Sequence, residues 1–136
     1  MRAGPVTDEQ RMIREGAAAF FAGDAGLQRV RAQRGRAPGY DVAAWREMAA
    51  LGWPGLRLPE RYGGIEARWS EALVLFEEAG RALAPEPLAP AMLAAAVLAR
   101  GDNEALKARW LPRFAAGEWV PALARQEAAG AQRADA

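Results

Sequence analysis

Apolar side chains recur at helical spacing along most of the chain, a pattern that predicts an all-α fold. Thr7 and Gln10 can form a capping box, in which side chain and backbone bond each other at the start of a helix. The apolar positions Ile13, Ala17 and Phe20 then share one face, so the first helix is expected to run to about residue 22. A short basic helix can follow over residues 27–33.

Two further helices are indicated by their caps and spacing. Asp41 is a good N-cap for a helix with Val42, Trp45 and either Met48 or Ala49 on one face, and Gly52 is placed to end it. Another helix is expected from residue 68 or 70 to residue 81. Its predicted apolar face consists of Trp69, Leu73, Phe76 and Gly80, and its predicted solvated side carries Glu71, Glu77 and Glu78.

The remaining elements complete a bundle of about five helices, with orthogonal or up-down packing. Pro90 can occupy the first position of an apolar helix over residues 91–99. Asp102 or Asn103 can cap a last helix that ends near Gly117. The pattern then changes, and Pro121 lies in a candidate edge strand. The expected organisation is a helical domain over residues 1–118, a first strand over 119–127 and a disordered tail over 128–136.

Residues 53–66 cannot form a regular helix, because they hold two prolines and three glycines. Glycine permits close approach of backbones, and proline fixes φ and removes a hydrogen-bond donor. We therefore expect a rigid irregular loop here. A connector between two helices is the favoured interpretation, ahead of a direct role in ligand binding.

The composition excludes several kinds of chemistry. The chain has no Cys and no His, so thiolate nucleophiles, disulfides and the commonest general base and metal ligand are absent. No apolar run reaches the roughly 20 residues of a membrane span, and we expect a cytoplasmic protein without a membrane partner. The net charge of +1 gives no argument for nucleic acid. Arg outnumbers Lys 17 to 1, which suggests a bacterial origin.

Four segments, in the right order, resemble motifs of the acyl-CoA dehydrogenase family. They are residues 50–64 (ALGWPGLRLPERYGG), 77–87 (EEAGRALAPEP), 106–118 (LKARWLP followed by GE) and 122–127 (ALARQE). The resemblance implies the N-terminal helical domain of a three-part enzyme. In such an enzyme a carboxylate removes the α-proton of an acyl-CoA thioester and the β-hydrogen leaves as hydride to FAD. The family keeps that carboxylate and most of the FAD site in later domains, so no catalytic residue is expected in this chain, which stops about where the flavin-binding part would begin.

The resemblance also implies candidate ligand-binding residues. Leu123, Arg125 and Gln126 match the strand that runs beside the flavin in the family. Arg125 replaces a small apolar residue there, and Ala128 replaces a proline, so the sequence departs from the family pattern at this point. The helix over residues 91–99 would line the acyl pocket, with candidates Met92, Leu93, Ala96 and Val97. An ordinary buried core helix is the competing interpretation.

The family implies FAD and acyl-CoA in the complete enzyme, without flavin binding by this chain alone. The expected partners are a β-domain and a C-terminal helical domain, or a homologous subunit, in an oligomer; no metal is expected. The alternative is a non-catalytic helical partner that binds an acyl-CoA dehydrogenase-like chain through an exposed apolar face. A third hypothesis, a nucleic-acid-binding domain, rests only on the basic residues around Arg34 and Arg36.

Overall fold

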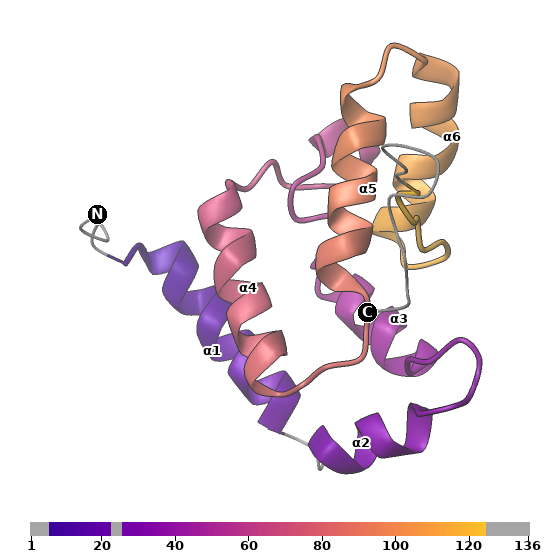
Figure 1. The fold of residues 1–136 in the computed structure, drawn as a ribbon. Coiled ribbons are helices and arrows are strands. Elements are labelled where there is room, and N and C mark those ends of the chain that lie inside the picture. The colour runs from indigo at the N-terminus through magenta and orange to yellow at the C-terminus, as the bar shows by residue number, and fades with distance from the viewer. Residues whose placement is uncertain (1–5, 23–25, 125–136) are drawn as a thin grey trace, which may run out of the picture.

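The computed structural model describes residues 6–22 and 26–124. Within them the chain forms six α-helices and one short 3₁₀ helix (Figure 1). In chain order these are α1 (Asp8–Ala22), α2 (Gly26–Gln33), α3 (Val42–Ala50), η1 (Glu60–Tyr62), α4 (Trp69–Arg81), α5 (Leu88–Arg100) and α6 (Glu104–Ala115). The all-α prediction is confirmed.

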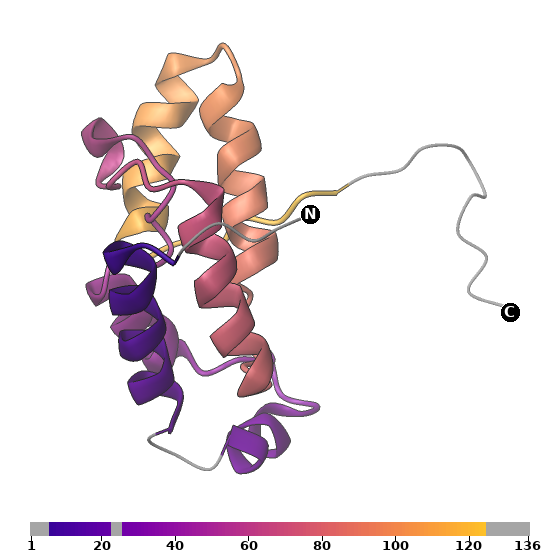
Figure 2. The same ribbon diagram turned by 90° about the vertical axis from the view of Figure 1, so that its left-hand side faces the viewer.

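The helices pair in two groups. α1 packs along α4, and α5 packs beside α6, against which η1 also lies. Figure 2 shows both pairs side by side, with α2 at one end of the molecule. Residues 119–124 form neither helix nor strand, and residues 125–127 lie outside the described part of the chain. The expected strand therefore stays a prediction.

The predicted starts of α1, α3 and α6 agree with the observed caps. The Thr7 amide donates to Oε1 of Gln10 at 3.2 Å, and the Gln10 amide donates to Oγ1 of Thr7 at 3.1 Å. The Asp41 carboxylate accepts from the first turn of α3, and Asn103 rather than Asp102 caps α6. α5 begins at Leu88, so Pro90 is its third residue and not its first. The capping bonds of Thr7, Asp41 and Asn103 satisfy backbone amides that would otherwise lack partners at the helix ends.

The core lies where α3, α4, α5 and α6 meet the loop that joins α3 to α4. Its large side chains with almost no exposed surface are Trp45, Met48, Leu58, Leu75, Leu88, Met92, Leu111 and Phe114. Phe21 of α1 packs against Trp53 of the loop, with ring centroids 5.8 Å apart. The three-residue face predicted for α3 is wrong at Val42, the first residue of that helix, which is exposed.

The predicted face of α4 is correct at Phe76, which packs against the core, and wrong at Leu73 and Gly80, which are exposed. Leu73 is 62% exposed, whereas Ala72, Val74 and Leu75 are buried together with Glu71 and Glu78. The physical reason is that α1 covers the acidic side of α4 and supplies hydrogen-bond donors to it. A buried carboxylate is tolerated only where such partners are present.

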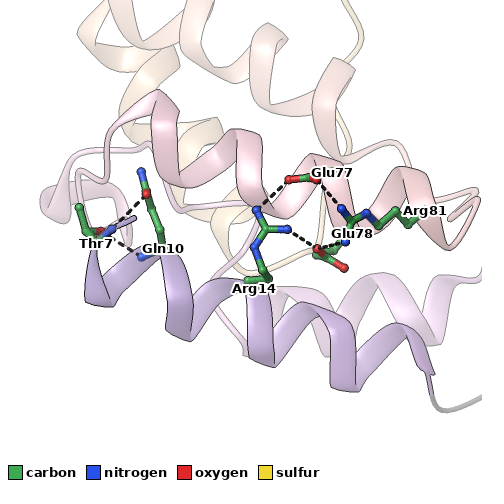
Figure 3. A network of polar contacts seen from close by, with 6 residues as sticks. All are labelled: Thr7, Gln10, Arg14, Glu77, Glu78 and Arg81. Atoms are coloured by element: carbon green, nitrogen blue, oxygen red, sulfur yellow. Dashed lines mark hydrogen bonds and ion pairs between the residues drawn. The ribbon is translucent and has the colours of Figure 1, made fainter. Parts of the chain in front are cut away.

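An ion-pair network joins α1 to α4 (Figure 3). Arg14 donates from Nη1 to Glu78 at 2.7 Å and from Nη2 to Glu77 at 2.8 Å, and Arg81 bonds both acids from the other side. The hydrogen bond from Arg14 holds the pKa of Glu77 below its usual 4.5. The bond between Arg14 and Glu77 therefore stabilises the fold above pH 4.5, and this stabilisation is lost as the pH falls through the lowered pKa of Glu77.

The variant Glu78→Gln tests this network, because it keeps the size of the side chain and removes its charge. We expect the free energy of unfolding to fall by about 1–3 kcal/mol, since Arg14 loses a buried charged acceptor. Urea unfolding at pH 7 measures the change. The control is Asp8→Asn, which removes an exposed pair to Arg11 and should change little. If both variants lowered the free energy of unfolding equally, the network between α1 and α4 would not stabilise the fold more than an exposed ion pair does.

The loop between α3 and α4 folds back on itself. The Glu66 amide donates to the Leu58 carbonyl at 3.0 Å, and the Ala67 amide donates to the Leu56 carbonyl at 2.9 Å. Gly64 lies at the turn of this hairpin-like path. A Cβ atom there would lie 2.5 Å from the carbonyl oxygen of Gly55 and still closer to that of Leu58. Only glycine fits this close approach of backbones.

Replacing Gly64 by Ala should therefore destabilise the protein by at least about 3 kcal/mol, because the atoms in the way are backbone atoms. The matched control is Gly80→Ala in α4, where nothing lies within 4 Å of the added Cβ. That change should stabilise the helix by up to about 1 kcal/mol. Thermal melting of both variants gives the comparison, and a harmless Gly64→Ala would show that the loop does not pack as described.

Candidate functional site

A shallow hollow opens between the start of α4, the outer face of α5 and the loop that precedes α4. Its volume is about 110 Å³. It is lined by Arg57, Trp69, Leu93, Ala96, Val97 and Arg100. Apolar side chains thus form its walls, and two guanidinium groups are the only charged groups that line it. This combination is typical of a site for an apolar ligand with a few polar anchors.

The loop and α4 together hold Arg57 in place. Its guanidinium lies over the Trp69 ring, 4.5 Å from the centroid. Its Nη1 also donates to the backbone carbonyl of Ala67. Both contacts fix a side chain that would otherwise sample many rotamers, so Arg57 is pre-organised at the hollow.

Three of the four candidate acyl-pocket residues lie together in this hollow. Leu93 and Val97 are each 49% exposed, and Ala96 lies between them on the same side of α5. Met92 is placed differently, since it is 2% exposed and belongs to the hydrophobic core. The helix therefore has a core face and a free apolar face, and the four candidates divide between them.

The candidate flavin-contacting residues are only partly described. Leu123 is half-exposed, and Arg125 and Gln126 lie outside the described residues. Just before them Trp119 stacks on Trp110, with ring centroids 4.9 Å apart, which ties this end of the chain to α6. Of the expected set, only Leu123 falls within the described residues, so the flavin contacts stay a prediction.

A second polar cluster joins η1 to α6. Tyr62 donates to Oε2 of Glu104 at 3.0 Å, and Lys107 bonds the other carboxylate oxygen at 2.5 Å. Lys107 and then Tyr62 lower the pKa of Glu104. All three groups are satisfied by one another, and this arrangement is typical of a structural link between elements. Within the residues described, no three acidic side chains converge on a point where a metal ion could bind.

The glutamates of α4 do not form a catalytic pair. Glu77 is exposed and Glu78 is buried, and both bond Arg14 and Arg81. The prediction of a solvated face holds for Glu77 and is wrong for Glu78. A carboxylate paired with two guanidinium groups is a poor general base, because those bonds stabilise its charged form.

Comparison with known proteins identifies the fold. Residues 7–118 match the family described as "Acyl-CoA dehydrogenase, N-terminal domain". The chain belongs to this family. Its helical core, glycine-bearing loop and apolar α5 thus form an acyl-CoA dehydrogenase N-terminal domain. None of the helices described in this domain is long and apolar enough to cross a membrane.

Individual relatives support the same assignment. The acyl-CoA dehydrogenase IpdE2 of Mycobacterium tuberculosis is 37% identical over 103 residues, which cover 73% of this chain and 32% of the relative. A solved Tcur3481-Tcur3483 steroid ACAD is 33% identical, with a TM-score of 0.74 over 83% of this chain and 31% of the other. The ChsE4-ChsE5 complex of M. tuberculosis is 27% identical, with a TM-score of 0.62 over 87% of this chain and 30% of the other. The chain thus spans about a third of the length of these proteins.

Sequence reasoning missed three residues of the hollow, namely Arg57, Trp69 and Arg100. One signal for Arg57 was present, because it lies between Leu56 and Leu58, and alternation of apolar and polar residues predicts opposite faces. Nothing local connects it with Arg100, which is far away along the chain. Their proximity depends on how the loop returns to α4.

The two faces of α5 can be distinguished by truncation. Met92→Ala should lower the free energy of unfolding by about 2–5 kcal/mol, the usual cost of a cavity in a packed core. Val97→Ala should cost less than about 1 kcal/mol, since half of that side chain is already in water. Denaturant titrations of both variants measure the difference. Similar losses from the two changes would show that Val97 is a core residue too.

Proposed function

We propose that this chain supplies the N-terminal helical domain of an FAD-dependent acyl-CoA dehydrogenase, an oxidoreductase that oxidises an acyl-CoA thioester between Cα and Cβ. The observation that carries the proposal is the family match over residues 7–118. The chain spans about a third of its relatives, so the activity belongs to an assembly of this domain with the β-domain and C-terminal helical domain. Such an enzyme works as an oligomer in this proposal.

The role proposed for this chain is to shape the acyl pocket. Leu93, Ala96 and Val97 present a partly exposed apolar surface beside Trp69 and Arg57. An acyl group packed there would exclude water from this wall of the pocket, which favours binding in proportion to the apolar area covered. The base and the flavin contacts would come from the other domains. Bound FAD would accept the hydride, and Leu123, Arg125 and Gln126 remain candidates for contacts near it.

The acyl group proposed is bulky rather than a thin straight chain. Ala96 contributes only a methyl group to the wall, so the hollow stays wide beside it. A solved relative at 33% identity carries the description "steroid ACAD", which agrees with a bulky substrate. These two observations support the substrate class from independent directions.

The second candidate function is a non-catalytic helical subunit. Two solved relatives are described by pairs of named chains, Tcur3481-Tcur3483 and ChsE4-ChsE5, which favours assembly with a homologous partner. The exposed apolar side chains that such a partner could cover include Ile65, Leu73, Leu93, Val97 and Leu123. Light scattering of the purified chain distinguishes the alternatives. If the chain stays monomeric after a homologous chain is added, the subunit hypothesis is wrong.

The proposed function can be tested by complementation. We expect the chain alone to bind no FAD, and the chain co-expressed with the β-domain and C-terminal domain of IpdE2 to copurify with them and to acquire visible flavin absorbance. Acyl-CoA-dependent bleaching of that flavin would show the dehydrogenation. In the complemented enzyme, Ala96→Leu should raise KM for a bulky acyl-CoA several-fold, because it fills the hollow.

The control for that variant is Ala105→Leu on the exposed side of α6, which should leave KM unchanged. Stoichiometric binding of FAD by the chain alone would overturn the proposed division of labour. A complemented enzyme in which both variants behave alike would remove α5 from the acyl pocket.

A further inference from the structure

The charges around the hollow are of one sign. Its lining contains Arg57 and Arg100 and no acidic side chain. Among the described residues neither arginine takes part in an ion pair, whereas five other arginines and Lys107 each reach a carboxylate. Two uncompensated guanidinium groups beside one hollow attract an anion, and a carboxylate fits the fork of a guanidinium well.

Arg57 is the better defined of the two. Stacking on Trp69 and donation from Nη1 to Ala67 hold its plane, while its buried Nε has no hydrogen-bond partner in the described part of the chain. A fixed guanidinium with a free edge loses little side-chain entropy when it binds an anion. Arg100 is the last residue of α5 and is exposed, so it can turn toward a ligand in the hollow.

The apolar part of the site limits the size of the ligand. A buried cavity of roughly 150 Å³ accommodates benzene, so the 110 Å³ of this open hollow suits one ring-sized portion of a larger acyl group. A neutral group of that size would cover the apolar wall but would also take water away from two guanidinium groups without replacing it. That desolvation is unfavourable unless the ligand brings a counter-charge.

We infer that this hollow recognises a carboxylate carried on an otherwise apolar acyl group, with Arg57 and Arg100 as the anchors and Trp69 and α5 as the apolar wall. This inference rests on the proposed function, in which the hollow is part of the acyl pocket, and narrows the substrate class to acyl-CoA thioesters whose acyl group bears a second, free carboxylate. The thioester carbonyl lies at the other end of such a group.

The test uses the whole chain with three small probes: cyclohexanecarboxylate, cyclohexylmethanol and acetate. The first has both an apolar body and a charge, and the others each lack one. Binding is followed by the NMR shift of the Trp69 indole N–H. We expect cyclohexanecarboxylate to bind about tenfold more tightly than either other probe. Added salt should weaken the binding of the carboxylate but not the binding of the alcohol.

Arg57→Gln and Arg100→Gln should each remove most of the preference for the carboxylate, whereas Arg100→Lys should retain part of it. The matched control is Arg109→Gln, which removes another arginine stacked on a tryptophan, 5.0 Å from the Trp110 ring. It should leave all three affinities unchanged. Melting curves verify that each variant is folded, and the exposed Arg100 provides a readout even if Arg57→Gln unfolds the loop.

Equal binding of the alcohol and the carboxylate would overturn the inference and leave an ordinary acyl pocket. Equal binding of acetate and cyclohexanecarboxylate, or no shift of Trp69 with any probe, would overturn it as well. None of these outcomes touches the flavin complementation that tests the proposed function, so the failure of one can be told from the failure of the other.

Discussion

The close return of residues 53–67 on themselves governs both the core and the hollow. Gly64 lets the two halves of this loop approach, and the backbone bonds to the Leu56 and Leu58 carbonyls hold them together. Leu56 and Leu58 thereby enter the core, while Arg57 between them faces outward toward Trp69. The same backbone path thus buries two leucines and fixes a cation at the surface, so loss of the loop geometry would disturb stability and the site together.

The sequence predicted those features of the fold that depend on interactions between residues close together along the chain. The caps at Thr7, Asp41 and Asn103 act within one helical turn, and their residues are recognisable without knowledge of the rest of the fold. The buried side of α4 was not predictable in this way. Glu78 looks solvent-exposed from its charge alone, and only the arrival of Arg14 from α1 makes its burial tolerable.

The candidate site shows the same difference between local features, which the sequence predicts, and contacts across the fold, which it does not. The α5 candidates came from the family resemblance, but that helix is apolar nearly all round, so the sequence could not separate Met92 in the core from Leu93 and Val97 at the surface. The arginines of the hollow were missed because their chemistry depends on proximity across the fold. A charge that has no partner among the described residues is visible only once the neighbours are known.

The hollow is open in this domain, and its energetics would change in the proposed assembly if a further domain covered it. Exclusion of water lowers the effective dielectric constant around Arg57 and Arg100, which strengthens their attraction for a carboxylate. The same exclusion raises the cost of placing a neutral group against them. Both effects favour a ligand that carries a carboxylate over a neutral one. A preference for the carboxylate probe on this chain would therefore be a lower bound on the preference of the proposed assembled enzyme.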